Sequence, residues 1–428
     1  MKNVLFIQPP FERIMGYKRF YTHPGLLSLA AVVEQAGHRV KVYDADYDPG
    51  NISLGAMELM ERYEHYIKAL SDDEAWIWEE ISNVILRFAP DVLCVTILTV
   101  TQDSARRVIE IAKELYPDLL VITGGVHPTI NPMDCIPYSD YVICNEGEDV
   151  ILDAIKGDIP KGVVFGSRIL ELDRLPFPAI HTLHNLSRYE KRDLSMVIST
   201  RGCPNQCKFC CSPLIWNGRV TRKSVDYFIQ ELKILIEEYQ INDFFISDDS
   251  FTYDKKWLKE FCIKIRPYQI TFRCLGRIDM IDEDIIDMLT KAGCRNIKLG
   301  IESGSQRILD MVNKKIRLED IRRADRILSR SKLDWSAFFI IGFPSETASD
   351  IRMTQELIMK LSAKSVTLSM FTPYPGTELY SDHNRVGAKY YSHHSPYNNF
   401  TGTMSNRKFI SLVRETNMLV SRKKYAEH

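Results

Sequence analysis

The sequence lacks both a long hydrophobic run and a secretion signal. No apolar stretch in its 428 residues approaches the roughly 18 residues that a membrane-spanning helix needs. The amino-terminal MKNVLFIQPP is a short apolar run that ends at a Pro-Pro pair, without the length or the small-residue cleavage site of a signal peptide. We therefore expect a cytoplasmic protein with no membrane span.

The sequence also lacks an excess of charge of either sign. Lys and Arg number 55, Asp and Glu number 56, and the formal net charge is −1. A protein that binds nucleic acid over a broad surface needs an excess of cations to neutralise phosphates, so nucleic acid is not an expected partner. The apolar share of 45% is sufficient for two or three packed domains.

Cysteine is scarce and unevenly placed. With 10 cysteines in a chain of this length, a disulfide scaffold is excluded. Three of them, Cys203, Cys207 and Cys210, nevertheless crowd into one short segment. Such crowding indicates metal or redox chemistry.

The first part of the chain alternates apolar strand-like runs with helix-period segments. Continuous apolar strands separated by helices are typical of a parallel sheet covered on both faces. The sequence therefore predicts an α/β, doubly wound (Rossmann-like) domain over residues 1–157. Because no GxGxxG follows the first strand, a nicotinamide or flavin dinucleotide is not expected. The predicted strands are 4–8, 39–46, 92–98, 119–125 and 141–144, and the predicted helices are 25–36, 103–115 and a long helical insert at 54–88.

A second series of strands and helices follows a proline-containing linker at 158–193. Six strands, each next to a helix, predict a partial (βα)6 barrel over 194–375, with its site at the carboxyl ends of the strands. Residues 376–428 form a short C-terminal extension with a final helix at 406–425. The predicted strands are 195–200, 243–247, 271–275, 296–300, 336–342 and 365–371, and the helices are 225–239, 255–265, 282–292, 318–331 and 350–361.

The crowded cysteines lie directly after the first strand of this barrel, in STRGCPNQCKFCC. Cys203, Cys207 and Cys210 can hold three irons of a 4Fe-4S cubane and leave the fourth iron open to a ligand. A zinc knuckle, completed by Cys211, is the structural alternative. Closed zinc sites usually pair two short Cys or His hooks, however, and the sequence has no second hook nearby.

This CxxxCxxC loop, with aromatic Phe209 inside it, resembles the radical S-adenosylmethionine (SAM) enzymes. The resemblance implies that the open iron chelates SAM and that one electron cleaves SAM to a 5′-deoxyadenosyl radical. It also implies a set of SAM-binding positions along the barrel. These are Asp248 and Asp249 in place of the family's Gly-Gly-Glu, Arg273 or Arg277 for the SAM carboxylate, Glu302 with neighbouring Ser303 for the ribose, and Gly342 in IIGFPSET on the adenine side. Asn313-Lys314 matches the family's run after the helix that follows Glu302.

A doubly wound domain ahead of such a barrel resembles the cobalamin (B12)-binding subclass. The matching features are PPFE, HPGLLSLAAVVEQAGHRVKVYDAD, TGGVHPT and NEGE. Because DxHxxG is missing, no protein histidine is expected on the cobalt, and His127 is expected only as a neighbour of the cofactor. Alternatively, the domain retains its fold without cobalamin and serves for docking. The implied cobalamin residues are Gln8, Pro9, Leu98, Thr99, Thr101, Gly124, Gly125, His127, Asn145, Glu146 and Gly147.

The leading functional hypothesis is a cobalamin-dependent radical SAM methyltransferase that acts on an unactivated carbon or phosphorus centre of a small molecule. In the subclass, one SAM methylates cobalamin and a second SAM yields the radical that prepares the substrate. The implied electron donor is a flavodoxin or a ferredoxin. The C-terminal extension offers candidates to line the substrate site, namely Tyr374, Glu378, Tyr380, His383, His393 and His394.

Three other hypotheses remain. A related enzyme with both cofactors would close or rearrange a ring without methyl transfer. A tRNA methylthiotransferase would share the architecture, but such enzymes have a cysteine after the first strand, where this chain has Gln8-Pro9-Pro10, and end in a basic β-barrel. A regulatory module would use its cluster only to sense redox state.

Overall fold

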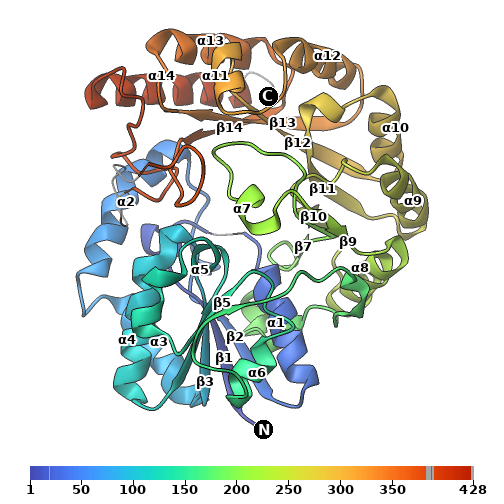
Figure 1. Cartoon of the computed structure of the whole chain (residues 1–428). Helices are drawn as coiled ribbons and strands as arrows, with labels where there is room; N and C mark the ends of the chain where they lie inside the picture. Colours follow the sequence, from blue (N-terminus) through green and yellow to red (C-terminus); the bar gives the residue numbers. More distant parts are fainter. Residues whose placement is uncertain (19, 382–386, 388–389, 426–428) are drawn as a thin grey trace.

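Two parallel sheets form the framework of the chain. We describe a computed structural model that covers residues 1–18, 20–381, 387 and 390–425 (Figure 1). Each sheet has six strands, in the order β2-β1-β3-β4-β5-β6 and β14-β13-β12-β11-β10-β7. Every pairing within the two sheets is parallel. The predicted doubly wound domain and partial (βα)6 barrel are both confirmed.

The first sheet is covered by helices on both faces, as its continuous apolar strands predict. Val4 and Phe6 of β1 pack with α1 and α6, whereas Leu5 and Ile7 pack with α3 and α4. This alternation follows from the two-residue period of a strand. The elements are β1 Asn3–Gln8, α1 Pro24–Gln35, β2 Arg39–Asp44, α2 Ala56–Leu70, α3 Trp76–Phe88, β3 Val92–Thr96, α4 Gln102–Leu115, β4 Leu120–Gly124, α5 Val126–Ile130, β5 Tyr141–Cys144, α6 Ile151–Lys156 and β6 Gly162–Phe165.

Two features of this domain differ from the prediction. The insert at 54–88 is not one helix but two, because the chain turns between Leu70 and Trp76. In addition, β6 lies inside the segment expected to be linker and pairs with β5. The first sheet therefore continues past residue 157.

The second sheet is preceded by a connection that is anchored on the first domain. Ala179 donates a backbone hydrogen bond to Leu27, and His184 donates one to Val42. The elements that follow are β7 Met196–Val197, β8 Thr200–Arg201, α7 Ser212–Trp216, β9 Thr221–Arg222, α8 Val225–Tyr239, β10 Asp243–Ile246, α9 Lys255–Ile265, β11 Thr271–Arg277, α10 Glu283–Lys291, β12 Cys294–Glu302, α11 Gln306–Met311, α12 Leu318–Ser329, β13 Asp334–Ile341, α13 Ala348–Lys360, β14 Ser365–Met370 and α14 Asn406–Tyr425.

The first predicted barrel strand, 195–200, is broken in the structure. Only Met196–Val197 pair with the sheet, and Thr200–Arg201 pair antiparallel with β9. The break arises because the backbone N–H groups of Ser199 and Thr200 donate to the carboxylate of Asp248, at 2.7 and 3.0 Å, and not to a neighbouring strand. The chain is thereby turned toward the cysteine loop.

Helix α14 lies against α13 and β14 at the far end of the barrel sheet (Figure 1). Its Phe409 is fully buried. The extension also contacts the first domain, because the Tyr397 hydroxyl donates to Glu64 of α2. In the part of the chain that the structure describes, no helix is long and apolar enough to cross a bilayer.

The barrel helices α8 and α9 are held to the sheet by an aromatic cluster. Phe261 is fully buried and stacks on Trp257, with ring centroids 5.4 Å apart. Its edge contacts include Phe251 and Phe272. Replacing a buried Phe by Ala removes these contacts and leaves a cavity.

We expect Phe261→Ala to lower the free energy of unfolding by about 3–5 kcal/mol. Ile263→Ala, on the same helix with 54% of its surface exposed, is the matched control, for which we expect a change within about 0.5 kcal/mol. Urea denaturation of the cofactor-free chain measures both values. Equal effects of the two substitutions would contradict this account of the core.

Candidate active site between the two domains

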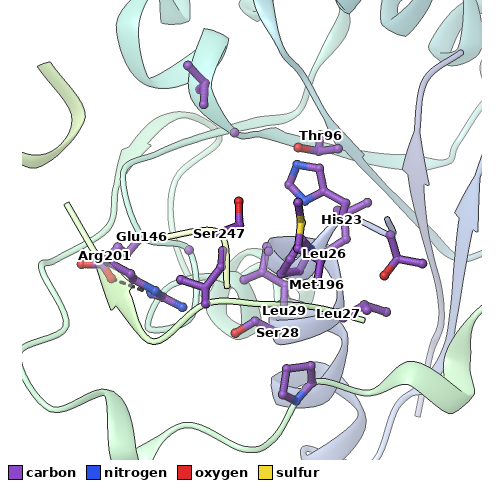
Figure 2. A pocket seen from close by; sticks show the side chains of 18 of the residues that line it. His23, Leu26, Leu27, Ser28, Leu29, Thr96, Glu146, Met196, Arg201 and Ser247 are labelled. Carbon is purple, nitrogen blue, oxygen red and sulfur yellow. Dashed lines mark hydrogen bonds and ion pairs between the residues drawn. The ribbon is translucent and has the colours of Figure 1, made fainter. Parts of the chain in front are cut away.

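One cavity of about 1260 Å³ lies between the carboxyl ends of the two sheets (Figure 2). Ligands of open parallel sheets bind at these ends, where the loops after each strand converge. Helix α1 forms part of the wall, with Leu26 and Leu27 beside Met196 of β7 (Figure 2). The predicted site residues that line the cavity are Leu98, Thr99, Gly124, Gly125, Asn145, Glu146, Gly147, Phe209, Cys210, Asp249, Tyr374 and His393.

The cysteine loop runs from β8 to α7, which lies between the two sheets in Figure 1. Asn205 donates to the sulfur of Cys203 at 3.3 Å, and the backbone N–H of Ser212 donates to that of Cys210 at 3.4 Å. Burial raises the pKa of Cys207, while the nearby cations of Lys314 and Arg277 lower it. Burial is the larger effect, so the pKa of Cys207 and that of Cys210 stay raised, and the nearby donors and cations only reduce this rise.

The donor set of this loop fits a cubane cluster. Cys203, Cys207 and Cys210 are free thiols on one loop. Among the described residues, no three His, Cys, Asp or Glu side chains are arranged as ligands of a single metal ion. In a cubane each cysteine binds a different iron. Phe209 packs on Phe343 with 5.7 Å between ring centroids, which anchors the loop on the barrel.

The loops after β3, β4 and β5 form a concave backbone surface on the opposite wall. Gly125 has φ +108°, and a Cβ there would lie 2.9 Å from the hydroxyl of Thr96 and 3.0 Å from the carbonyl of Ile97. Only glycine fits this position, which lets the loop after β4 pack closely against the loop after β3 at the cavity wall. The cavity also continues as an apolar slot between α1 and the sheet, lined by Leu27, Ala31, Cys94, Ile122, Ile143 and Ile151.

Four of the predicted cobalamin residues lie outside the cavity wall. Thr101 accepts the backbone N–H of Leu98 at 3.1 Å and so shapes the loop from behind. His127 is fully buried, with Nδ1 3.3 Å from the Thr99 hydroxyl and Nε2 3.5 Å from Asp134. These local partners agree with the expectation that it does not bind cobalt. The other two, Gln8 and Pro9, are buried behind the end of β1.

The SAM candidates divide into those at the cavity and those that support it. Asp249 lines the cavity and accepts the Ser212 hydroxyl at 2.8 Å. Asp248 is 1% exposed and committed to the backbone that enters the cysteine loop. Of the two predicted SAM contacts, only Asp249 lies at the cavity, because the carboxylate of Asp248 is engaged by Ser199 and Thr200.

The two arginine candidates also separate. Arg273 binds Asp243 at 3.0 Å and the Tyr21 hydroxyl at 3.1 Å, away from the cysteine loop. Arg277 is buried beside Cys207, where its guanidinium binds Asp279 at 3.0 Å and the carbonyl of Lys314 at 2.9 Å. Of the two arginines, Arg277 is thus the one next to the cysteine loop.

Glu302 forms a buried ion pair with Lys314 at 2.6 Å, with side-chain exposures of 8% and 9%. The segment that carries Lys314 also packs on the cysteine loop, since Asn313 donates to the carbonyl of Gln206 at 2.7 Å. Ser303 is fully buried, and its hydroxyl accepts the N–H of Ser305 at 3.1 Å. Its hydroxyl also lies 3.3 Å from that of Thr354, and neither Ser303 nor Glu302 lines the cavity.

Comparison with known proteins agrees with this geometry. Residues 197–358 match the family model of the radical SAM superfamily, and residues 17–155 match that of the B12 binding domain. An uncharacterised methyltransferase of Pyrococcus horikoshii is 30% identical over 387 residues, which cover 84% of this chain and 82% of that protein. The chain belongs to the B12-binding radical SAM family. The resemblance inferred from the sequence is confirmed.

Two further relatives show the breadth of this family. The anaerobic magnesium-protoporphyrin IX monomethyl ester cyclase of Rubrivivax gelatinosus is 25% identical and aligns with 74% of this chain and 62% of its own length. The structure of the radical SAM methyltransferase TsrM from Kitasatospora setae superposes with a TM-score of 0.68 at 17% identity, over 89% of this chain and 75% of that one. The superposition on TsrM supports the two-domain fold described for this chain.

The enzyme therefore uses a 4Fe-4S cluster, SAM and cobalamin, as its two family domains imply. Sequence reasoning named Lys314 through the Asn313-Lys314 match, and this lysine pairs with Glu302 and lies near Cys207. It missed Arg201, which lines the cavity and pairs with Glu146 and Glu148. The position of Arg201 beside the cysteine motif is a signal that could have indicated it. Among the tail candidates, Tyr374 and His393 line the cavity, Glu378 is exposed beside Lys208, and His383 lies outside the described residues.

Gly342 is held in place from both sides. A Cβ at this position would lie 2.7 Å from the ring of Phe409. The buried carboxylate of Glu346 accepts the backbone N–H groups of Gly342 and Phe343. Burial raises the pKa of Glu346 to about 8, against the opposing effect of these two donors.

This raised pKa predicts a pH-dependent stability. The native state binds the Glu346 proton more tightly than the unfolded chain, whose carboxyl titrates near 4.5. The stabilising contribution is therefore complete below pH 4.5 and is lost as the pH rises to about 8. Glu346→Gln stays neutral, so we expect its stability relative to wild type to increase over this window, by up to ~1.4 kcal/mol per pKa unit.

Denaturation of the cofactor-free protein at several pH values measures this difference. Glu356→Gln, on the exposed face of α13, is the control, with side-chain exposure of 70% at that position. A wild-type-to-Glu346→Gln difference that stays constant with pH would contradict the assignment.

The cysteine loop yields a separate prediction. We expect Cys207→Ala to lose most of the about four irons that a reconstituted chain holds, because one of three iron ligands is removed. Cys211→Ala, in the same loop but outside the CxxxCxxC motif, should keep them. Iron and sulfide analysis after anaerobic reconstitution and desalting measures both. Equal iron loss in the two variants would contradict the ligand assignment.

Proposed function

We propose that this enzyme transfers a methyl group from SAM, by way of cobalamin, to an unactivated carbon of a small molecule. The observation that carries the proposal is the single cavity whose walls come from the β3, β4 and β5 loops on one side and the cysteine loop on the other. A methyl carrier and a radical source bound on these walls would share one space. The methyltransferase of P. horikoshii, which aligns along most of both chains, supports the same reaction type.

The residues of the two walls have distinct proposed roles. When bound, the cluster would supply one electron to SAM and cobalamin would supply a methyl carrier. Cys203, Cys207 and Cys210 would hold three irons. Asp249, Arg277, Glu302 and Gly342 are the proposed SAM contacts, with Asp248 and Ser303 as their supports. The loops at Gly124-Gly125 and 145–147 would hold cobalamin, and the apolar slot against α1 would take an apolar part of it, such as a displaced aromatic base.

The proposed substrate position is beside Tyr374 and His393. The Tyr374 hydroxyl lies 3.1 Å from Nε2 of His393, and Nδ1 of His393 lies 3.2 Å from the carbonyl of Met370. This carbonyl can only accept, so Nδ1 carries the proton and Nε2 accepts from the tyrosine. Burial lowers the pKa of His393, which favours this neutral form. The pair would orient a polar group of the substrate by hydrogen bonding.

The reductant that we propose is a flavodoxin or a ferredoxin, because SAM cleavage consumes one electron at a time. Ring closure without methyl transfer is the second candidate function. It is favoured by the similarity to the R. gelatinosus cyclase. The two candidates differ in their products, since only methyl transfer consumes SAM to S-adenosylhomocysteine.

The test uses the full chain, reconstituted anaerobically with iron, sulfide and hydroxocobalamin and then desalted. We expect about four irons and about one cobalt per chain. With SAM and a chemical reductant, we expect both S-adenosylhomocysteine and 5′-deoxyadenosine. Formation of 5′-deoxyadenosine without S-adenosylhomocysteine would favour the cyclase alternative, and a preparation that retains no cobalt would contradict the proposal.

A further inference from the structure

Arg201 joins the two walls of the cavity. It is the last residue of β8, two positions before Cys203. Its guanidinium binds Glu146 and Glu148 at 2.6 Å each, and these glutamates belong to the loop after β5 of the first domain. Figure 2 shows the bond to Glu146 at one side of the pocket. The contact thus connects the proposed cobalamin loop to the cluster loop.

The three side chains are largely withdrawn from water. Arg201 is 19% exposed, and Glu146 and Glu148 are 3% and 5% exposed. A buried carboxylate is costly unless a cation and further donors satisfy it. Burial by itself would lower the pKa of Arg201, but the two carboxylates raise it. We therefore expect Arg201 to stay in contact with both glutamates, whereas the partners of an exposed ion pair readily exchange for water.

Additional hydrogen bonds hold Glu146, Glu148 and Arg201 in place. Glu146 accepts the backbone N–H of Ile169 at 2.8 Å, and Glu148 accepts the hydroxyl of Ser28 at 3.1 Å. Arg168 donates to the backbone carbonyl of Arg201 at 2.7 Å. The Arg168 guanidinium also lies over the ring of Trp216, 4.5 Å from its centroid, at the end of α7. Both flanks of the cysteine loop are thereby tied to the connection between the domains.

The chain between Arg201 and the first cysteine has little freedom. Gly202 has φ +103°, and a Cβ at this position would lie 2.1 Å from the carbonyl of Arg219. The backbone is therefore closely packed where it leads from Arg201 to Cys203. The two residues are therefore joined by a segment that has little room to move independently.

We propose that Arg201 is a positioning residue that sets the register between the cobalamin loop, residues 145–148, and the cluster loop, residues 203–210. This inference rests on the proposed function. Each domain can bind its own cofactor without Arg201, but transfer of a methyl group from SAM to reduced cobalamin requires both walls at a fixed separation. In this transfer the S–CH3 bond of SAM breaks, a Co–C bond forms, and S-adenosylhomocysteine is released, with a chemical reductant in the assay supplying the electrons that reduce cobalamin.

The test compares Arg201→Gln with wild type, without any need for the substrate. We expect the retained iron and cobalt and the rate of 5′-deoxyadenosine formation to fall much less than the rate of cobalamin methylation, because each of them depends mainly on one wall. We expect methylation of reduced cobalamin by SAM, followed by its visible spectrum, to slow by at least about tenfold. The rate of cobalamin methylation in Arg201→Lys should lie between the rates of wild type and Arg201→Gln. An ammonium keeps the charge but lacks the planar fork that binds two carboxylates.

Arg174→Gln is the matched control, because Arg174 forms an exposed ion pair with Asp149, next to the same loop, at 2.6 Å. It should match wild type in every assay. Methylation of cobalamin at the wild-type rate by Arg201→Gln would overturn the proposal. Loss of both cofactors and of 5′-deoxyadenosine formation would also overturn it, because Arg201 would then serve only folding.

A second measurement separates this proposal from the proposed function. In the cofactor-free chain, Arg201→Gln should expose the connection 166–193 to limited proteolysis by chymotrypsin, which does not cleave at arginine, faster than wild type does. Glu148→Gln should act like Arg201→Gln. Equal cleavage rates would overturn the positioning role. If wild type forms no methylcobalamin but the cleavage rates differ as expected, then the proposed function fails while the contact between the domains stands.

Discussion

The carboxyl ends of two parallel sheets must face one cavity, and most features of the site depend on this constraint. Each sheet satisfies its own backbone hydrogen bonds, so each domain would fold as a unit with loops at its carboxyl edge. The connection between them, anchored at Leu27 and Val42, then decides where the second edge lies relative to the first. The cavity exists because this connection returns along the first domain before the barrel begins.

Much of this arrangement could be predicted because it is local in sequence. Buried parallel strands are continuous apolar runs, so the sequence predicts β1, β3 and β13 as strands. Helix starts are local as well, as Asp254, Asp282 and Thr347 show by capping α9, α10 and α13 with their side chains. The cysteine loop gives the clearest prediction of a functional site, since the three predicted iron ligands lie within one short segment.

The remainder could not be predicted because it depends on residues that meet only after folding. Asp248 and Asp249 are adjacent in sequence, yet only Asp249 reaches the cavity, because the carboxylate of Asp248 is engaged by the backbone of Ser199 and Thr200. Likewise Arg201 and Glu146 lie far apart along the chain, and their pairing requires both sheets to be in place. The break between β7 and β8 has the same origin, since a sequence pattern does not show that Asp248 will compete for the strand's N–H groups.

The charges around the cavity are arranged in buried pairs, and this arrangement constrains how the substrate can be held. Glu302 is paired with Lys314, Arg201 with Glu146 and Glu148, and Lys223 with Glu231. A cation engaged in this way offers little attraction to an incoming anion, because separating the pair would leave a carboxylate buried without a partner. The Tyr374–His393 pair differs, since both groups are neutral and can exchange hydrogen bonds without separating charges. The two kinds of site thus differ in cost, since a ligand can exchange hydrogen bonds with Tyr374 and His393 without separating a buried ion pair.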